Sequence, residues 1–490
     1  MSRPPLAPRG RHALPATVLA LLWLTAAAAS AGASPNGDAG IFRVRAYGAA
    51  GDGKRDDTPA FQRAIDAAAS VGGTVVVDPV GRGRGYVLTG RLEVKQGVSI
   101  VGAPAGMPFI AWEGTPRAMQ TGAVILARPA PSEYEGKAKR ALFDLQGGNT
   151  VRGLYILYDR QPWPSDAEFD DPKSPYHYPS DADRVERFLR DHVKPVGPTF
   201  TIRPGVASVT IEDITCGRYW DFLALTGGGK VFVHRCYLFG YKRAFAVREA
   251  KDTLRIDGIH IVPNVEEPIS WKCAKLHEII TAWDDNIAFD FGSVDGYSIN
   301  DVVVFLAHTG MRLGTSKARP FRDPNTGEET VHAWGQGPWG SVHNLKLDNV
   351  TVGIECVLGT ILPNQFTNTM VHVSIRPRER FGGSPGIAAR QGAVVVEPGF
   401  GGATLQFANL SLSSFAPKNV VASGAMVAQA GGRAFLFDSP ERTVTVTVFG
   451  LAMSNTPADH LVAATPGSKW RLQLRGWTRD GEPQPDSETP

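Results

Sequence analysis

Charged side chains recur along the middle of the chain at intervals that could bring them to one place. Carboxyl groups, a cation and an imidazole stand 19 to 24 residues apart at Asp221, Lys242, Glu266, Asp285 and His308. One carboxyl that donates a proton, beside a second that activates water, is the arrangement that hydrolyses glycosidic bonds. These groups can act together only if the fold repeats with the same interval.

An apolar pattern repeats with nearly that interval. It has the form apolar-x-apolar-x-x-apolar-x-apolar and occurs at Val209–Cys216, Val231–Leu238, Leu254–Ile261, Ala274–Thr281 and Tyr297–Val304. The steps between these copies are 22, 23, 20 and 23 residues, and further copies begin at Leu345 and Leu405. Each half alternates with period two, which predicts a short strand with one buried face. Polar pairs between the halves, such as Glu212–Asp213, predict a corner.

A third feature follows most copies after eight or nine residues, as at Ala224–Leu225, Ala246–Val247 and Arg312–Leu313. Three short strands per turn of about 22 residues are typical of a parallel β-helix, an all-β solenoid whose equivalent residues stack about 4.8 Å apart. A propeller is disfavoured because its blades need about 40 residues. In the solenoid the polar series lies along one edge, just before the third strand of each coil.

The predicted solenoid domain spans residues 40–475 and begins with a helix. Asp56-Asp57-Thr58-Pro59 predicts the helix start, with Thr58 as N-cap and Pro59 at the first position. Phe61 and Ile65 belong to its apolar face, and Gly72-Gly73 predicts its end. Such a helix could cover the open end of the solenoid.

Two long insertions interrupt the repeat, at about 160–200 and 315–341. Insertions of this length in a folded domain are usually functional or disordered. We expect their Trp and Tyr side chains to pack rather than to bind sugar. The repeat loses its register from about 353 to 404, and residues 476–490 are expected to form a polar tail.

The formal net charge of +3 comes entirely from the N-terminus. Residues 1–33 contain Arg3, Arg9 and Arg11 without an acidic residue, so the remainder has equal numbers of basic and acidic residues. A neutral chain argues against nucleic acid as a partner, since no general positive field would attract it. The basic start, the apolar stretch Leu14–Ala29 and the small residues Ala31-Gly32-Ala33 predict a signal peptide. We expect a secreted or periplasmic protein without a stable membrane anchor, with a signal anchor as the alternative.

Four cysteines are too few for a disulfide scaffold in a chain of 490 residues. Cys216 and Cys236 occupy different positions of the repeat, which predicts core thiols rather than a bridge. The cysteine spacings do not resemble a metal site, and Asp52, Asp56 and Asp57 are interpreted as turn and cap residues. No metal and no cofactor are therefore expected.

Residues 42–102 resemble the start of the pectate-lyase-like superfamily of right-handed β-helix proteins. The resemblance lies in Val44–Ala49, Gly51–Gly53, Asp56–Thr58, Gly72–Val77, Leu92–Val94 and Val98–Gly102. It implies a single right-handed parallel β-helix and action on a polysaccharide. It does not imply one reaction, because hydrolases, lyases, epimerases and phage tailspikes share this fold.

The central segment is similar to the active-site region of polygalacturonase-type glycoside hydrolases. The matching residues are Asn264-Val265-Glu266, Asp284-Asp285 and Ala307-His308-Thr309-Gly310. The resemblance implies that Asp284 is the general acid, that Glu266 and Asp285 activate water, and that His308 tunes them. The chain departs from the family at the Arg-x-Lys substrate clamp, since Gly353-Ile354-Glu355-Cys356 stands near its place.

The partner implied by these features is a polysaccharide substrate. The candidate residues for binding it are Asp221, Lys242, Arg243, Trp283, Asp290 and Arg312. Two further functions remain open. The chain could be a polysaccharide lyase in which Lys242, Arg243 or Arg312 removes a proton from a uronate, or a carbohydrate-binding protein without catalysis. In the last case Asp284-Asp285 would be only a polar corner.

Overall fold

The computed structural model describes residues 40–103, 122–136, 139–262, 273–315, 319–330, 338–357, 367–377, 392–396, 404–413, 433–437, 443–454 and 461–489. Residues 40–490 form one unit, to which everything below refers. The predicted signal peptide lies outside the described residues. No helix among the described residues is long and apolar enough to cross a membrane.

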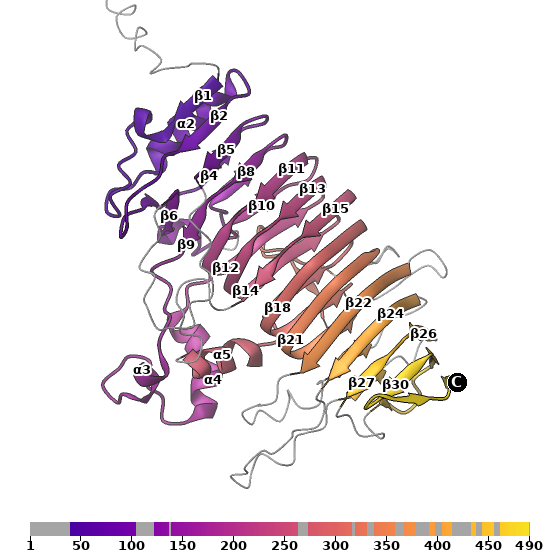
Figure 1. The fold of residues 1–490 in the computed structure, drawn as a ribbon. Coiled ribbons are helices and arrows are strands. Elements are labelled where there is room, and N and C mark those ends of the chain that lie inside the picture. The colour runs from indigo at the N-terminus through magenta and orange to yellow at the C-terminus, as the bar shows by residue number, and fades with distance from the viewer. Residues whose placement is uncertain are drawn as a thin grey trace, which may run out of the picture. The chain divides into compact units, whose positions relative to one another are not determined.

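The described strands form three columns in which successive coils pair in parallel, from indigo β1 to the yellow C-terminal strands of Figure 1. The first column contains β1 (Ile41–Arg43), β2 (Thr74–Val77), β5 (Ser99–Gly102), β8 (Thr150–Arg152), β11 (Ala207–Glu212), β13 (Gly229–His234), β15 (Lys251–Asp257), β18 (Asp295–Leu313), β21 (Trp339–Cys356), β22 (Thr367–Pro377), β24 (Thr404–Ser413), β26 (Val444–Phe449) and β29 (Trp470–Arg475).

The other two columns complete each coil. The second contains β3 (Tyr86–Leu88), β6 (Val124–Ala127), β9 (Tyr155–Leu157), the first halves of β12 (Thr215–Thr226) and β14 (Tyr237–Arg248), β16 (His260–Ile261), and later β27 (Ala452–Ser454) and β30 (Trp477–Arg479). The third contains β4 (Leu92–Val94), β7 (Phe143–Leu145), β10 (Phe200–Ile202), the second halves of β12 and β14, β17 (Ile287–Phe291), the ends of β18 and β21, β23 (Gly392–Val396), β25 (Arg433–Phe437) and β28 (Val462–Ala464).

The core is built from the apolar positions of the repeat. Val209 pairs with Val231, and Val231 pairs with Leu254, so that equivalent side chains from neighbouring coils stack and are buried. Phe245 and Phe289 stack in the third column with their ring centroids 5.2 Å apart. This arrangement is β-helix-like, and it explains why the apolar spacing recurs with each coil.

The predicted corners between the first two strands of a coil are confirmed. Asp213, Gly258 and Asp301 have φ values of 53°, 64° and 51°, which place them in the left-handed region. Asp and Gly tolerate this conformation better than most residues. The Asp or Gly residue at these three corners therefore suits the backbone conformation there.

One copy of the predicted repeat is wrong. Ala274–Ala282 forms helix α5, and strand β15 pairs directly with β18 instead of with a strand at that place. Leu276, Ile279 and Ile280 are buried, which is the three- and four-residue spacing of a helix face. The apolar positions of the predicted strand copy also fit this helical spacing, which explains why the sequence pattern suggested a strand here.

Helix α2 (Thr58–Ala69) lies where a helix was predicted, but Asp57 and not Thr58 is its N-cap residue. The Asp57 carboxylate accepts hydrogen bonds from the backbone N–H groups of Ala50 and Gly51. The Thr58 hydroxyl oxygen accepts one from the backbone N–H of Thr89. Both side chains thus hold neighbouring loops instead of the helix end. The capping of the solenoid by this helix stays a prediction.

The C-terminal part also differs from expectation. Strand β22 pairs with β21 and β24, so the coil series continues through part of the segment where the sequence pattern is weak. Residues 476–490 were expected to be a polar tail but contain β30, β31 (Glu482–Gln484) and β32 (Ser487–Thr489). Trp477, the buried aromatic residue of this segment, donates a hydrogen bond from its indole N–H to the carbonyl oxygen of Pro485.

The insertion at about 160–200 forms α3 (Asp166–Asp170) and α4 (Asp181–His192), which lie beside α5 (Figure 1). The Asp166 carboxylate accepts hydrogen bonds from the first backbone N–H groups of α5. Trp163 packs against Phe239 with a centroid distance of 4.6 Å, and Tyr176 packs against His192 at 5.0 Å. The packing role predicted for these aromatic residues is confirmed.

The second insertion forms a hairpin of β19 (Phe321–Arg322) and β20 (Glu329–Thr330). Its turn reaches the third column, where Thr201 Oγ1 donates to Asn325 Oδ1 at 2.7 Å and Thr226 Oγ1 donates to Asp323 Oδ2 at 3.1 Å. The described residues also include the 3-10 turns η2 (Val44–Tyr47) and η3 (Pro131–Glu133). All four cysteines are buried and lie outside disulfide bonds, as predicted for Cys216 and Cys236.

Candidate active site

The polar series converges where the third strands begin. Lys242 and Arg243 belong to β14, and His308 and Arg312 to the end of β18. Trp283, Asp284 and Asp285 occupy the turn between α5 and β17, which the backbone hydrogen bond from Asn286 to Trp283 closes at 2.9 Å. Glu266 lies outside the described residues, so its predicted role stays a prediction.

The solvent-facing part of this cluster consists of Trp220, Trp283, Asp284 and Asp285, and the buried Lys242 contacts three of them. We call these five residues the open edge. Lys242 Nζ is 2.9 Å from Asp285 Oδ2, and the two indole centroids lie 5.2 Å apart. The ammonium group is 5.6 Å from one indole centroid and 5.5 Å from the other. The Asp284 and Asp285 side chains are 55% and 48% exposed. The open edge thus offers two carboxylates beside a pair of partly exposed aromatic rings.

Three of the predicted substrate-binding residues form a buried ion-pair cluster instead. Arg243 donates from Nε to Asp221 Oδ1 at 2.8 Å and from Nη1 to Asp290 Oδ2 at 3.1 Å. Arg243 also donates to the carbonyl oxygen of Arg322 and lies under the ring of Phe321. The charges satisfy one another beneath the hairpin, so this cluster fixes the hairpin on the strands.

A second buried pair lies one step along the same column. Asp290 pairs in register with Arg312, and Arg312 pairs with Glu355. Arg312 Nε donates to Glu355 Oε2 at 2.6 Å, while its Nη2 donates to the backbone carbonyl oxygen of Asp284 at 3.2 Å. Glu355 was not predicted as a site residue, although its position in the column next to Arg312 could have indicated it.

Arg319 connects this buried pair to the open edge. Its Nη1 donates to Asp284 Oδ2 at 2.8 Å, and its Nε lies 3.5 Å from Glu355 Oε1. The residue comes from the start of the second insertion, whose position in space the repeat does not predict. Asp284 is therefore held by two arginines, one at its side chain and one at its backbone.

Asp285 is ionised in this arrangement. Partial burial would raise its pKa, but the positive charges of Lys242 and Arg243 outweigh that effect and hold the pKa at about 2. A carboxyl with such a low pKa is a poor proton donor at neutral pH. It can act as an ionised base or as an electrostatic partner of a cation.

His308 is buried and neutral. Its backbone N–H donates to Asn286 Oδ1 at 3.0 Å, and its Nδ1 lies 3.0 Å from the hydroxyl oxygen of Thr309. Burial lowers the pKa of His308 to about 4, and the negative charges of Glu355 and Asp284 offset only part of this effect. The predicted role of His308 in tuning the catalytic carboxyl groups stays a prediction.

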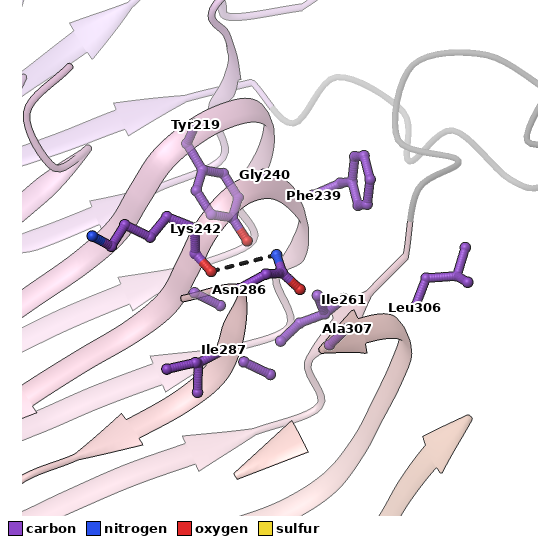
Figure 2. A pocket seen from close by; sticks show the side chains of 11 residues that line it. Tyr219, Phe239, Gly240, Lys242, Ile261, Asn286, Ile287, Leu306 and Ala307 are labelled. Carbon is purple, nitrogen blue, oxygen red and sulfur yellow. Dashed lines mark hydrogen bonds between the residues drawn. The ribbon is translucent and has the colours of Figure 1, made fainter. Parts of the chain in front are cut away.

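The cavity next to the open edge is too small for a sugar. It is lined by Tyr219, Phe239, Ile261, Asn286 and Ala307 among others, and its volume of about 10 Å³ is near the minimum for one water molecule. In Figure 2 the ammonium group of Lys242 points away from this cavity. Among the described residues, no group of three or more His, Cys, Asp or Glu side chains could hold a metal ion.

Comparisons with known proteins support the family resemblance. Residues 41–148 match the family described as rhamnogalacturonase A/epimerase, pectate lyase-like. The pectate-lyase-like resemblance of the N-terminal segment is thereby confirmed. This match covers less than a quarter of the chain and ends before the open edge.

Two curated relatives and one solved structure extend the comparison. The chain is 47% identical over 77 residues to mannuronan C5-epimerase AlgE3, and 46% identical over 73 residues to alginate lyase 7, both from Azotobacter vinelandii. These matches cover 15% and 14% of this chain, but only 4% and 8% of the two relatives. The tailspike protein of Escherichia coli bacteriophage HK620, solved with a pentasaccharide, shares the fold with a TM-score of 0.52 and 10% identity, over 90% of this chain and 66% of that chain.

The buried cluster around Arg243 generates a stability prediction. Arg243→Met leaves Asp221 and Asp290 buried without their cation, and we expect a loss of about 3–5 kcal/mol in the free energy of unfolding. Arg235→Met is the matched control, because Arg235 is 55% exposed and pairs with Asp213 at the surface, and it should cost less than about 1 kcal/mol. Urea unfolding measures both. A similar small loss in both variants would contradict the structural role of Arg243.

The low pKa of His308 generates a pH prediction. Between pH 6.5 and about 4 an ordinary histidine of the unfolded chain binds a proton that the folded chain does not bind. The folded state therefore loses stability as the pH falls through this window. His308→Gln removes this contribution, so between pH 7 and pH 4 the wild type should lose up to about 3 kcal/mol more than the variant. Urea unfolding at the two pH values tests this, and equal losses would contradict it.

Proposed function

We propose that this protein is an exported enzyme that hydrolyses glycosidic bonds of a polysaccharide at the open edge. The proposal includes a signal peptide at residues 1–33 and a single right-handed parallel β-helix over residues 40–475. The observation that carries it is the pair of exposed carboxylates, Asp284 and Asp285, beside the two indoles of Trp220 and Trp283. Partly exposed aromatic rings give the apolar faces of sugar rings a surface to pack on. The relatives named for mannuronan and alginate support a polymeric sugar as substrate.

The proposed reaction divides the work between the two carboxyl groups. Asp285 is ionised, so it takes a proton from the attacking water. Asp284 protonates the oxygen of the leaving sugar, the role implied by the resemblance to polygalacturonase-type hydrolases. Arg319 donates to Asp284 Oδ2, so the proton that Asp284 transfers is carried on Oδ1 while Arg319 holds the carboxyl group in place. Each of the two carboxyl groups has a cation beside it, Lys242 at Asp285 and Arg319 at Asp284.

Polysaccharide cleavage by β-elimination is the second candidate. The observation in its favour is that Lys242 and Arg319 each contact an exposed carboxylate, so a uronate carboxylate could replace that partner. Arg243 and Arg312 are unsuitable as the base. Burial alone would lower their pKa values, but the neighbouring carboxylates raise them above the ordinary arginine value. Lys242 is the remaining base among the three predicted for this reaction.

A polysaccharide panel tests the proposed function. The purified chain without residues 1–33 is incubated with alginate, polygalacturonate and a neutral α-1,3-glucan, and products are followed by new reducing ends and by ultraviolet absorbance. Hydrolysis gives reducing ends without absorbance, whereas β-elimination gives both. We expect Asp285→Asn to lower the hydrolytic rate by about 100-fold or more, because the base is lost.

The matched control is Asp295→Asn, which changes an exposed carboxylate outside the open edge. It should keep the wild-type rate. Products that absorb in the ultraviolet would show that the protein cleaves the polymer by β-elimination and not by hydrolysis. Unchanged activity in a folded Asp285→Asn variant, or sugar binding without product from any polymer tested, would contradict catalysis at the open edge.

A further inference from the structure

Glu355 is a buried carboxylate in the third column, at the place where the polygalacturonase-type resemblance would put the cations of a substrate clamp. Its exposed fraction is 2%. It stands in register with Arg312 on the neighbouring coil, and through Arg312 with Asp290. The cationic group near this position is instead supplied by Arg319, from the second insertion.

The two oxygens of Glu355 face two different arginines. Oε2 accepts from Arg312 Nε at 2.6 Å, and Oε1 lies 3.5 Å from Arg319 Nε. Both arginines continue to Asp284, since Arg319 Nη1 binds its Oδ2 at 2.8 Å and Arg312 Nη2 binds its backbone oxygen at 3.2 Å. Glu355 itself is not among the exposed groups of the open edge. The contacts form a closed path from Glu355 through both guanidinium groups to one exposed aspartate.

We propose that Glu355 is a positioning residue that holds Arg319 and Arg312 and thereby fixes Asp284 at the open edge. The proposal rests on the proposed function, because it assigns Asp284 its place in catalysis. In this arrangement Arg319 of the second insertion supplies the cation beside Asp284, and the carboxylate of Glu355 lies behind that cation.

The electrostatics explain why a carboxylate is needed. Burial would raise the pKa of Glu355, but Arg312 and Arg319 hold it below the ordinary value, so the group is charged. A neutral amide at this place would leave two nearby guanidinium groups with less compensating charge. Arg319 would then be free to move toward solvent, and Asp284 would lose the contact that fixes its carboxylate. Small misplacements of a reacting group have large effects on rate.

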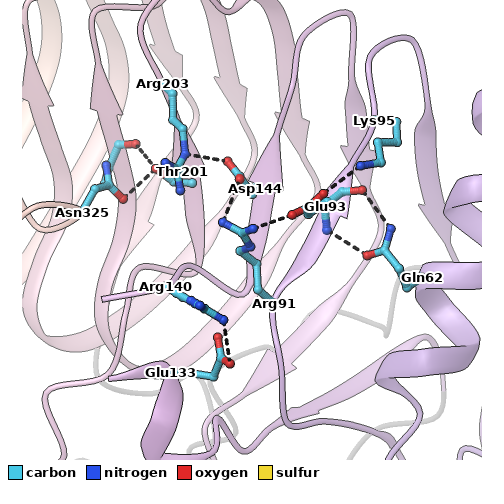
Figure 3. Close-up of polar contacts among 11 residues, drawn as sticks. Gln62, Arg91, Glu93, Lys95, Glu133, Arg140, Asp144, Thr201, Arg203 and Asn325 are labelled. Carbon is cyan, nitrogen blue, oxygen red and sulfur yellow. Dashed lines mark hydrogen bonds and ion pairs between the residues drawn. The ribbon is translucent and has the colours of Figure 1, made fainter. Parts of the chain in front are cut away.

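The chain offers a matched control in Asp144. This carboxylate is also buried between two arginines, with Arg91 Nη1 at 3.3 Å and Arg203 Nε at 3.1 Å (Figure 3). Asp144 lies on β7 in the same strand column, paired with Glu93 and Thr201 in register. The carboxylate partners of Arg91 are Glu93 and Asp144, and that of Arg203 is Asp144. Arg319, in contrast, contacts Asp284 of the open edge as well as Glu355. Asp144→Asn therefore disturbs the same kind of ion pair without touching Asp284.

The experiment compares Glu355→Gln with Asp144→Asn on the polymer that the wild type cleaves. Both variants should unfold at lower urea concentration than the wild type. Glu355→Gln should lower kcat by about 10- to 100-fold and alter the pH profile of kcat, with little change in KM. Asp144→Asn should keep the kcat, KM and pH profile of the wild type. Wild-type kcat and pH profile in folded Glu355→Gln, or an equal loss of kcat in Asp144→Asn, would overturn the proposal.

Arg319→Gln serves as a second variant in case Glu355→Gln does not fold. It breaks the connection to Asp284 while the pair of Glu355 with Arg312 remains, so it should reproduce the loss of kcat. An unchanged kcat in this variant would overturn the proposal.

A crystal structure of Glu355→Gln separates the positioning role from the proposed function. If the wild type cleaves none of the polymers, the proposed function fails, but the geometry can still be tested. We expect the contact between Arg319 Nη1 and Asp284 Oδ2 to be lost in the variant. Its retention at the wild-type distance of 2.8 Å would overturn the positioning role, whatever the activity.

Discussion

The balance of buried charge between neighbouring coils is the constraint on which the candidate site depends. A parallel column brings equivalent residues within one strand spacing, so a buried charge in it needs an opposite charge close by. Asp290, Arg312 and Glu355 follow one another in register and alternate in sign. Arg243 adds a further positive charge to this series and binds both Asp221 and Asp290. These pairs keep several charges buried in the third column.

The same balance divides the cations of the site into two groups. Arg243 and Arg312 have buried carboxylate partners, and separating them would leave uncompensated charge inside the protein. Lys242 pairs with the partly exposed Asp285, and a ligand could replace that contact, whereas Arg319 pairs with the exposed Asp284 and is held there by the buried Glu355. The ion-pair contact that a ligand could replace therefore lies at the open edge, while the buried pairs hold the strands, the hairpin and Asp284 in place.

The sequence predicts much of the column architecture and the gathering of Lys242, Asp285 and His308 along one edge, because both follow from a regular apolar interval. It places a coil with Glu266 between Lys242 and Asp285, whereas β14 pairs directly with β17. It predicts less where the chain leaves that interval. The copy at Ala274–Thr281 satisfies a strand pattern and a helix pattern together, and packing against the insertion decides for the helix. Arg319 reaches the site from an insertion, and Glu355 pairs with it from β21. Both contacts depend on long-range geometry that residue spacing does not contain.

The most direct test of the account is a crystal structure of the Asp285→Asn variant with a short oligosaccharide of the cleaved polymer. The account predicts one sugar ring packed against Trp220 or Trp283, with its glycosidic oxygen within hydrogen-bonding distance of the Asp284 carboxyl. A sugar bound at another surface in saturating ligand, with the open edge unoccupied, would contradict the central claim that these residues form the polysaccharide site.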